Sequence, residues 1–317
     1  MIQEYALDPE MLANEFPRDT RFFREAFGPN SIRFLSCFPK RWRDDLKGAF
    51  KRSEYKDDTV AKKALLAFGD RLLERAIKRN HDLLVGGSWL AKAEHEHSQK
   101  PFHAILTKEN PNENEAVIPL ENVHKHPRWN DQRLLRPKRT ASAIASVVEP
   151  LIVRAPEVIF VDPYFDIVRD EYRHAFNEYF NCIEKNLVTS KPKVTIITGL
   201  KGTWERGVRQ PSQENIAAFV DDCRQLLPQM MPENCSVEVA IVKEISGGEE
   251  LHDRFIITKY TAIKFGKGLG CLADNTDLRV NLTLLPYGKG DSLWELYNLQ
   301  RQPAAFENLI EPFIVQT

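Results

Sequence analysis

The sequence has 317 residues, of which 42% are hydrophobic and 28% are charged, and its formal net charge is −1. This composition allows a sizeable core beneath a hydrated surface and excludes intrinsic disorder, collagen and coiled coil. The length suggests two domains, since domains average about 100–200 residues. No stretch approaches the roughly 20 apolar residues of a membrane span, and residues 1–5 lack a signal-peptide pattern, so we expect a cytoplasmic protein.

The sequence pattern of residues 1–138 predicts an α+β domain that combines helices with a small antiparallel sheet. Asp8-Pro9-Glu10 has the pattern of a helix start, and Thr20 can cap a second helix that stops at Gly28. Apolar residues recur at helical spacing around 42–50 and, most strongly, from Thr59 to Lys78. Short apolar runs between polar loops indicate strands at 32–38, 89–91, 102–106 and 116–120.

The same half of the chain contains two basic stretches. From Arg33 to Arg79 there are 14 Lys and Arg against seven Asp and Glu, and from Lys125 to Arg139 there are six against one. A basic surface attracts polyanions, although globular helices are often rich in Lys and Arg for solubility alone. The function of this domain stays open, with a protein partner as one interpretation. The proline-containing, weakly periodic stretch 126–138 indicates the boundary to a second domain.

The cysteine and histidine patterns predict neither a disulfide framework nor a metal site. The five cysteines are scattered without a CxxC pair, and their odd number argues against complete pairing. Histidine gathers at residues 95–97, 103, 124 and 126, but nothing in the sequence fixes a third ligand for a metal ion. We therefore expect free buried thiols, and neither a metal nor a cofactor.

Residues 139–317 predict an α/β domain with a mixed sheet flanked by helices. Buried strands at 157–161, 193–197 and 237–242 alternate with helices at 141–153, 170–187 and 213–227, which is typical of parallel βαβ units. Strands at 254–258, 262–265 and 277–285 follow with only turns between them, so antiparallel strands join the sheet late. Asp162 follows the first of the parallel strands, at the edge where open α/β sheets bind their ligands.

A His and an Arg lie two residues apart where the strand at 254–258 begins. In an extended strand, His252 and Arg254 point to one face and Asp253 points to the other. An imidazole beside a guanidinium can hold a phosphate, because Arg binds two oxygens at once and His can attack phosphorus or transfer a proton. An ion-paired strand is the structural alternative for these residues.

The surrounding sequence resembles the phospholipase D-like superfamily. Residues 252–257 with 262–269 are similar to one half-site of that family, and residues 158–165 are similar to the first strand of its fold. The half-site is degenerate and looks like that of the C-terminal domain of microtubule-interacting-and-trafficking (MIT) proteins and of bacterial phospholipase D-like proteins. His252 and Gly266 match the active pattern, whereas Arg254 holds its Lys position, Lys259 its Asp position and Lys267 its Ser position.

This resemblance implies a site that engages phosphodiesters. The lost identities favour recognition of nucleic acid or another phosphorylated ligand over turnover, and the similarity to bacterial proteins implies a role in anti-phage defence. Active members use two histidine motifs, so the alternative is a homodimeric, metal-independent nuclease or phosphodiesterase in which His252 of two protomers meet. A structural or adaptor platform is the third interpretation. The candidate catalytic residues are His252, Arg254 and Asp162, and the candidate phosphate or nucleic-acid ligands are Arg254, Lys264, Lys267, Arg206 and Lys201.

Overall fold

The structure is a computed structural model, and it describes residues 3–79, 86–130, 132–186, 192–200, 211–272, 276–300 and 304–317. The chain divides into two compact units, residues 2–132 and residues 133–317. The second unit thus begins before residue 139, where the sequence places its start. The reason is a short strand, β5 (Leu134–Leu135), which pairs with a strand of the second unit.

In the described part of the first unit, four strands form a parallel sheet in the order β2-β1-β3-β4. They are β1 (Gln3–Leu7), β2 (Arg33–Leu35), β3 (Ala104–Thr107) and β4 (Val117–Pro119). The expectation of an antiparallel sheet was wrong. Helices connect β1 to β2 and β2 to β3, and such crossovers return the chain to the sheet in the same direction.

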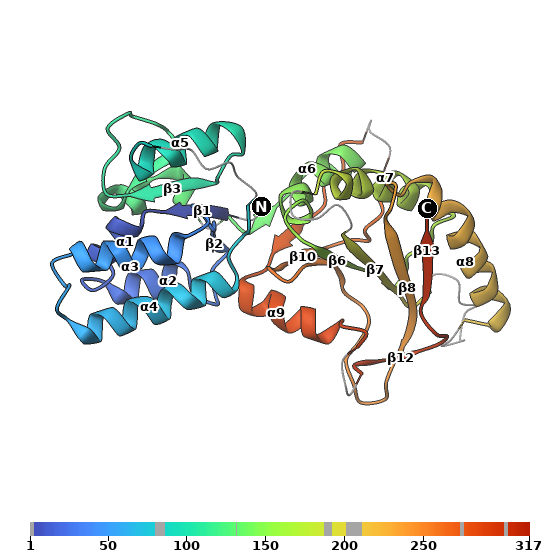
Figure 1. Ribbon diagram of the computed structural model, residues 1–317. Coiled ribbons are helices and arrows are strands. Elements are labelled where there is room, and N and C mark those ends of the chain that lie inside the picture. The colour runs from blue at the N-terminus through green and yellow to red at the C-terminus, as the bar shows by residue number, and fades with distance from the viewer. Residues whose placement is uncertain are drawn as a thin grey trace. The chain divides into compact units, whose positions relative to one another are not determined.

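Helices cover both faces of this first sheet (Figure 1). One face packs against α1 (Pro9–Glu15), α2 (Thr20–Ala26), α3 (Trp42–Arg52) and α4 (Thr59–Glu74), through a core that includes Tyr5, Leu7, Trp42 and Phe68. The other face packs against α5 (Trp89–Gln99), through Ala6, Ala93 and Ile105. The short 3-10 helices η1 (Leu120–Lys125) and η2 (Pro127–Trp129) complete this unit.

Residues 89–91 form the first turn of α5, so the strand predicted there was wrong. The Ser88 hydroxyl accepts a hydrogen bond from the Ala91 backbone N–H at 3.2 Å and caps the helix. Two helix ends also differ from expectation. Asp19 rather than Thr20 caps α2, and α4 ends at Glu74, before the predicted end at 78.

Among the described residues, the second unit forms one nine-stranded sheet in the order β12-β8-β7-β6-β9-β10-β11-β5, with β13 also paired to β8. β6, β7 and β8 are parallel, and the remaining pairs are antiparallel. The α/β class and the mixed sheet predicted for this part of the chain are therefore confirmed. The strands besides β5 are β6 (Glu157–Val161), β7 (Lys193–Thr198), β8 (Ser236–Glu244), β9 (Arg254–Ile257), β10 (Ala262–Phe265), β11 (Leu282–Leu284), β12 (Phe306–Asn308) and β13 (Phe313–Gln316).

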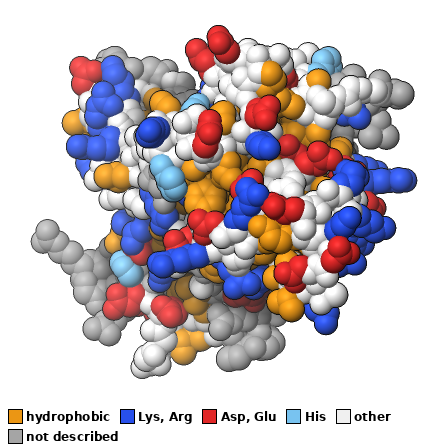
Figure 2. Space-filling model, turned by 90° about the vertical axis from the view of Figure 1, so that its left-hand side faces the viewer, with side chains coloured by type: hydrophobic (Ala, Val, Ile, Leu, Met, Phe, Trp, Pro, Cys, Tyr) orange, Lys and Arg blue, Asp and Glu red, His pale blue; other side chains and the backbone are white. Residues whose placement is uncertain are grey.

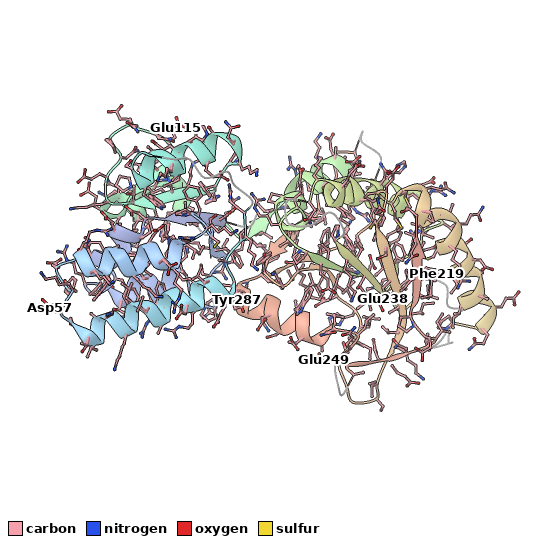
Figure 3. The ribbon with its side chains drawn as sticks, viewed as in Figure 1. Asp57, Glu115, Phe219, Glu238, Glu249 and Tyr287 are labelled. Atoms are coloured by element: carbon pink, nitrogen blue, oxygen red, sulfur yellow. The ribbon has the colours of Figure 1, made fainter. Side chains whose placement is uncertain are left out.

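The helices α6 (Ala141–Ile152), α7 (Asp170–Glu184) and α8 (Gln213–Leu226) cover one face of this sheet, and α9 (Tyr287–Leu296) covers the other (Figure 1). A short 3-10 helix, η3 (Leu227–Gln229), follows α8. Phe160 of β6 stacks on Tyr179 of α7, and Phe219 lies on the side of α8 that faces the sheet (Figure 3). In the described part of the chain, no helix has the length and apolar character that crossing a bilayer requires.

Candidate functional site

Three strands bring candidate residues to one edge of the second sheet. β9 runs antiparallel to both β6 and β10, and Arg254 lies opposite Phe265 of β10. Continuing the register between β6 and β9 places Asp162, the residue after β6, opposite Arg254. Lys267 follows β10 at the same edge. This is the carboxyl edge of the parallel strands, where ligands of open α/β sheets bind.

Asp162 is a buried carboxylate that fastens the segment after β10 to the end of β6. It is 1% exposed, and it accepts hydrogen bonds from Tyr164 N at 2.9 Å, Leu269 N at 2.7 Å and the Tyr172 hydroxyl at 3.1 Å. Burial raises the pKa of Asp162, and these hydrogen bonds and the charge of Arg254 act in the opposite direction. The carboxylate is fully engaged within the protein, which is typical of a positioning residue. We call Asp162, Tyr172 and Leu269 the latch.

A glycine lets the segment after β10 approach the latch. A Cβ at Gly268 would lie 3.2 Å from both the carboxylate Oδ2 and the tyrosine hydroxyl of the latch. The Tyr179 hydroxyl donates to Leu269 O at 3.0 Å, so Leu269 is held through its N–H and through its carbonyl. Lys267, just before this anchored stretch, is exposed. Its backbone is therefore fixed although its side chain is free to meet a ligand.

Arg254 is a half-buried cation without a hydrogen bond or an ion pair among the described residues. Its Nε is buried and has no hydrogen-bond partner. The guanidinium carbon lies 5.0 Å from the centre of the Tyr164 ring, within the range of a cation–π interaction. Tyr164 is itself 37% exposed. The edge thus presents a cation and an aromatic ring side by side, with guanidinium N–H groups available to an anion.

His252 lies just before β9 and outside the extended strand that the sequence predicts for it. Its side chain is 63% exposed, and its Nδ1 and Nε2 lie 3.6 Å from a Glu250 oxygen and 3.5 Å from an Asp253 oxygen. Among the described residues, no hydrogen bond or cation–π contact joins His252 to Arg254. The predicted opposition of Asp253 and Arg254 fits the contacts of both residues. Asp253 pairs with Lys264 on the face that α9 covers, and Arg254 lies beside Tyr164.

The other basic residues that the sequence suggests as phosphate ligands differ in whether they already have an ionic partner. Lys264 Nζ lies 2.6 Å from Asp253 Oδ2, so an ion pair already engages this cation. Lys267 has no ion pair in the part of the chain that the structure describes. Arg206 and Lys201 lie outside the described residues.

Two tyrosines of this edge were not singled out by sequence reasoning. Tyr164 lies within residues 158–165, which resemble the first strand of the phospholipase D-like fold, but that resemblance gives the aromatic ring no role. Tyr172 carries no signal, because a buried tyrosine on an amphipathic helix cannot be told from an ordinary core residue. Only the fold shows that its hydroxyl reaches Asp162.

Several of the described histidines of the first unit make structural contacts, and His97 Nδ1 accepts a hydrogen bond from Phe102 N at 3.1 Å. His95 and His97 lie on α5, and the ring of His103 lies with Nε2 2.7 Å from the Arg128 carbonyl oxygen. Burial lowers the pKa of His103. Within the described ranges, no three or more His, Cys, Asp or Glu side chains gather as a metal site would require.

Basic residues in the stretch from Arg33 to Arg79 form ion pairs with acidic side chains. Arg43 pairs with Asp70, and Arg52 Nη2 lies 2.6 Å from Glu10 Oε1. On the face that Figure 2 draws, Asp and Glu side chains lie among the Lys and Arg side chains. These pairs fit a solvated helical surface rather than a uniform basic patch.

The solved structures that this chain resembles include two distant likenesses. No protein-family model matches the sequence, and no curated protein matches it. The chain is similar to Nuc, a phospholipase D family member from Salmonella typhimurium, with a TM-score of 0.34 and 10% identity, over 55% of this chain and 96% of Nuc. It is also similar to TrmBL2, an archaeal chromatin protein that binds DNA, with a TM-score of 0.25 and 9% identity, over 74% of this chain and 65% of TrmBL2. Both scores are low, so neither likeness carries an argument about function.

Proposed function

We propose that the second unit binds a phosphodiester group of nucleic acid at Arg254. The observation that carries this proposal is the half-buried guanidinium, which has neither a hydrogen bond nor an ion pair in the described part of the chain. Removing a charge from water is unfavourable unless a partner compensates it. The Asp162 carboxylate compensates the charge of Arg254 in part, through space, without a hydrogen bond to it. An external phosphate would supply the hydrogen-bonding partner, because its oxygens match the parallel N–H donors of a guanidinium.

The neighbours of Arg254 favour a nucleic acid strand over free phosphate. Tyr164 offers a partly exposed ring beside the cation, and bases of single strands stack on such rings. Lys267, at the same edge, would neutralise an adjacent phosphate of the same strand. The Asp162 carboxylate holds the backbone N–H groups of Tyr164 and Leu269, so one buried group positions both the ring and the segment that carries Lys267.

The surroundings of His252 favour recognition without turnover. The two carboxylates nearest its ring, Glu250 and Asp253, place negative charge where a phosphate would have to approach. Lys264 is already paired and would not neutralise a pentacovalent phosphorus. Arg254 has no ion pair among the described residues, so it is suited to hold a phosphate in place.

The test compares two arginine variants in oligonucleotide binding. A fluorescein-labelled single-stranded oligonucleotide is titrated with Arg254→Ala and Arg224→Ala proteins, and anisotropy is followed at several NaCl concentrations. Arg224 is an exposed arginine near the end of α8, and its guanidinium carbon lies 5.8 Å from the centre of the Phe313 ring. Arg224→Ala therefore removes the same charge from a similar aromatic neighbour. Arg254→Ala should weaken binding about tenfold and lower the salt slope by about one, whereas Arg224→Ala should change neither.

Equal effects of the two variants would contradict a site at Arg254. Cleavage of the oligonucleotide in EDTA that disappears in His252→Ala would instead establish the homodimeric nuclease. The anti-phage role that the sequence resemblance implies is tested by plaque counts on bacteria that express the parent chain or Arg254→Ala. Protection by the parent alone would connect the binding site to defence.

A further inference from the structure

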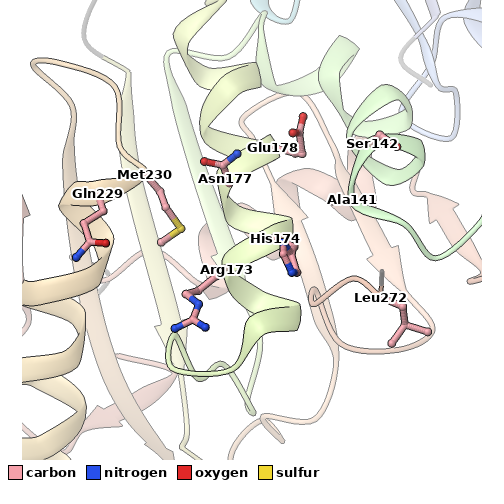
Figure 4. Close-up of a pocket in the computed structure, with 9 residues that line it drawn as sticks. All are labelled: Ala141, Ser142, Arg173, His174, Asn177, Glu178, Gln229, Met230 and Leu272. Carbon is pink, nitrogen blue, oxygen red and sulfur yellow. The ribbon is translucent and has the colours of Figure 1, made fainter. Parts of the chain in front are cut away.

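A second concave site lies on the outer side of α7, away from the sheet (Figure 4). Its volume is about 530 Å³, which suits a small organic ligand. Side chains of α7 form its floor, the first turn of α6 and Leu272 form one wall, and Gln229 and Met230 form the other. No residue of the site at Arg254 lines this pocket.

The unbalanced charge of this pocket is negative. Arg173 lines it, but Arg173 forms an ion pair with Asp170. Glu178 is a half-buried carboxylate, and the described residues give it no hydrogen bond and no ion pair. Lys185, on the turn that follows α7, lies with Nζ 3.0 Å from Glu149, and its charge also acts on Glu178 through space without an ion pair between the two. Since Arg173, the cation of the lining, is paired with Asp170, a cationic ligand would give Glu178 the direct partner that the described residues do not supply.

The other polar side chains of the pocket are also available. Ser142, His174 and Asn177 line it, and none of the three side chains has a hydrogen-bond partner within the described ranges. Met230 and Leu272 supply apolar surface on the two walls. Besides the paired Arg173, the lining therefore combines one carboxylate without an ion pair among the described residues, three polar side chains and two apolar contacts, which matches a cationic head on a short carbon chain.

We propose that this pocket binds a small organic cation, an amine or a guanidinium, with its charged head on Glu178. The carbon chain of the ligand lies against Met230 or Leu272, and Asn177 or Ser142 accepts the remaining N–H groups of the head. The cation is either a free amine or a Lys or Arg side chain of a bound peptide. This site is independent of phosphate binding at Arg254.

Calorimetric titration of the full chain tests the proposal with three probes, which are agmatine, 1-pentanol and a blocked Gly-Arg-Gly peptide. We expect saturable binding of agmatine with a Kd on the order of 1 mM and no saturable binding of the uncharged alcohol. Glu178→Gln should weaken agmatine binding about tenfold. Glu184→Gln removes the same charge from an exposed position on the same helix and should leave the affinity unchanged.

A second variant keeps the test decisive if Glu178→Gln does not fold. Asn177 is exposed, so Asn177→Trp fills the pocket from the surface and should abolish binding. Binding of the peptide but not of agmatine supports the cation site and assigns its ligand to a protein side chain. Absence of saturable binding by both cations overturns the proposal, as does equal affinity in the Glu178→Gln and Glu184→Gln proteins. Arg254→Ala should leave the affinity for agmatine unchanged, so this proposal and the phosphate proposal fail separately.

Discussion

Tyr172→Phe isolates the hydrogen bond that closes the latch. The substitution removes the hydroxyl that donates to Asp162 Oδ2 at 3.1 Å and keeps the ring, which packs edge-on against Phe165. A hydrogen bond to a charged group contributes about 1.5–3 kcal/mol. Two backbone donors remain on the carboxylate, so we expect a loss at the lower end, about 1.5–2 kcal/mol in the free energy of unfolding. For a unit of this size, that corresponds to a fall in Tm of about 3–8 °C.

The matched control is Tyr297→Phe in the same unit. Tyr297 is 3% exposed, and its hydroxyl has no hydrogen bond among the described residues. Urea unfolding of the two variants, followed by circular dichroism, should show a change within about 0.5 kcal/mol for Tyr297→Phe. Equal losses in the two variants would refute the argument that the latch hydroxyl is the stabilising group.

The pH dependence of the Tyr172→Phe effect gives a second check. Burial raises the pKa of the Asp162 carboxyl group in the folded state above its value in the unfolded state. The unfolded state therefore loses the carboxyl proton at a lower pH than the folded state does. As a result, the contribution of Asp162 to stability falls as the pH rises through the folded-state pKa. Removing a donor raises the pKa of Asp162 further. The loss should therefore be larger at about pH 7 than at about pH 4, where the carboxyl takes up a proton. A loss that grows on acidification would contradict this assignment.

Three further substitutions test other parts of the fold. Gly268→Ala places a Cβ 3.2 Å from both latch oxygens, and should destabilise the second unit by about 1–3 kcal/mol in urea unfolding and weaken oligonucleotide binding. The Arg79 guanidinium donates hydrogen bonds to the buried Glu4 carboxylate at 2.6 and 2.9 Å and to Glu96 at 3.1 Å. Arg79→Met leaves this carboxylate buried without its partner, and should lower the free energy of unfolding of the first unit by about 3–5 kcal/mol in the same assay. Ser88→Ala removes the cap of α5 and should lower its stability by about 1 kcal/mol, measured as faster amide hydrogen exchange in that helix.

Several elements of the second unit follow the sequence because they are locally marked, whereas β5, α9, β12 and β13 were not predicted. The strands predicted at 157–161 and 262–265 match β6 and β10, since each is a short apolar run between polar residues. The helix predicted to begin at 213 is α8, and Ser212 caps it by accepting a hydrogen bond from Asn215 N. Such signals depend on neighbours in the chain and survive without knowledge of tertiary contacts.

The first unit departs from its sequence where tertiary contacts replace local signals. β1 contains Gln3 and Glu4, which hide the apolar run that marks a buried strand, although they are 4% and 2% exposed. Arg79 pairs with the Glu4 carboxylate, and the Asn130 carbonyl accepts from Gln3 Nε2, both from distant positions in the chain. Residues 89–91 fit a strand or a helix equally well, and the cap at Ser88 decides for the helix.

The candidate site was only partly visible in the sequence for the same reason. Asp162 and Arg254 were recognised from their places at strand ends, but their neighbours come from across the fold. The Leu269 N–H that binds Asp162 lies 107 residues further along the chain. Alternation along a strand also predicted one face for His252 and Arg254, and this could not anticipate that β9 begins only at Arg254.

The position of β5 has a consequence for dividing the chain into modules. β5 (Leu134–Leu135) supplies the outermost strand of the second unit and covers the backbone of β11. A fragment that starts at residue 139 would expose unpaired N–H and C=O groups along β11, which is a template for association with other chains. A fragment that starts at Arg133 retains β5, which covers β11. Chimeric and fusion proteins that contain the second unit should therefore have their junction before residue 133.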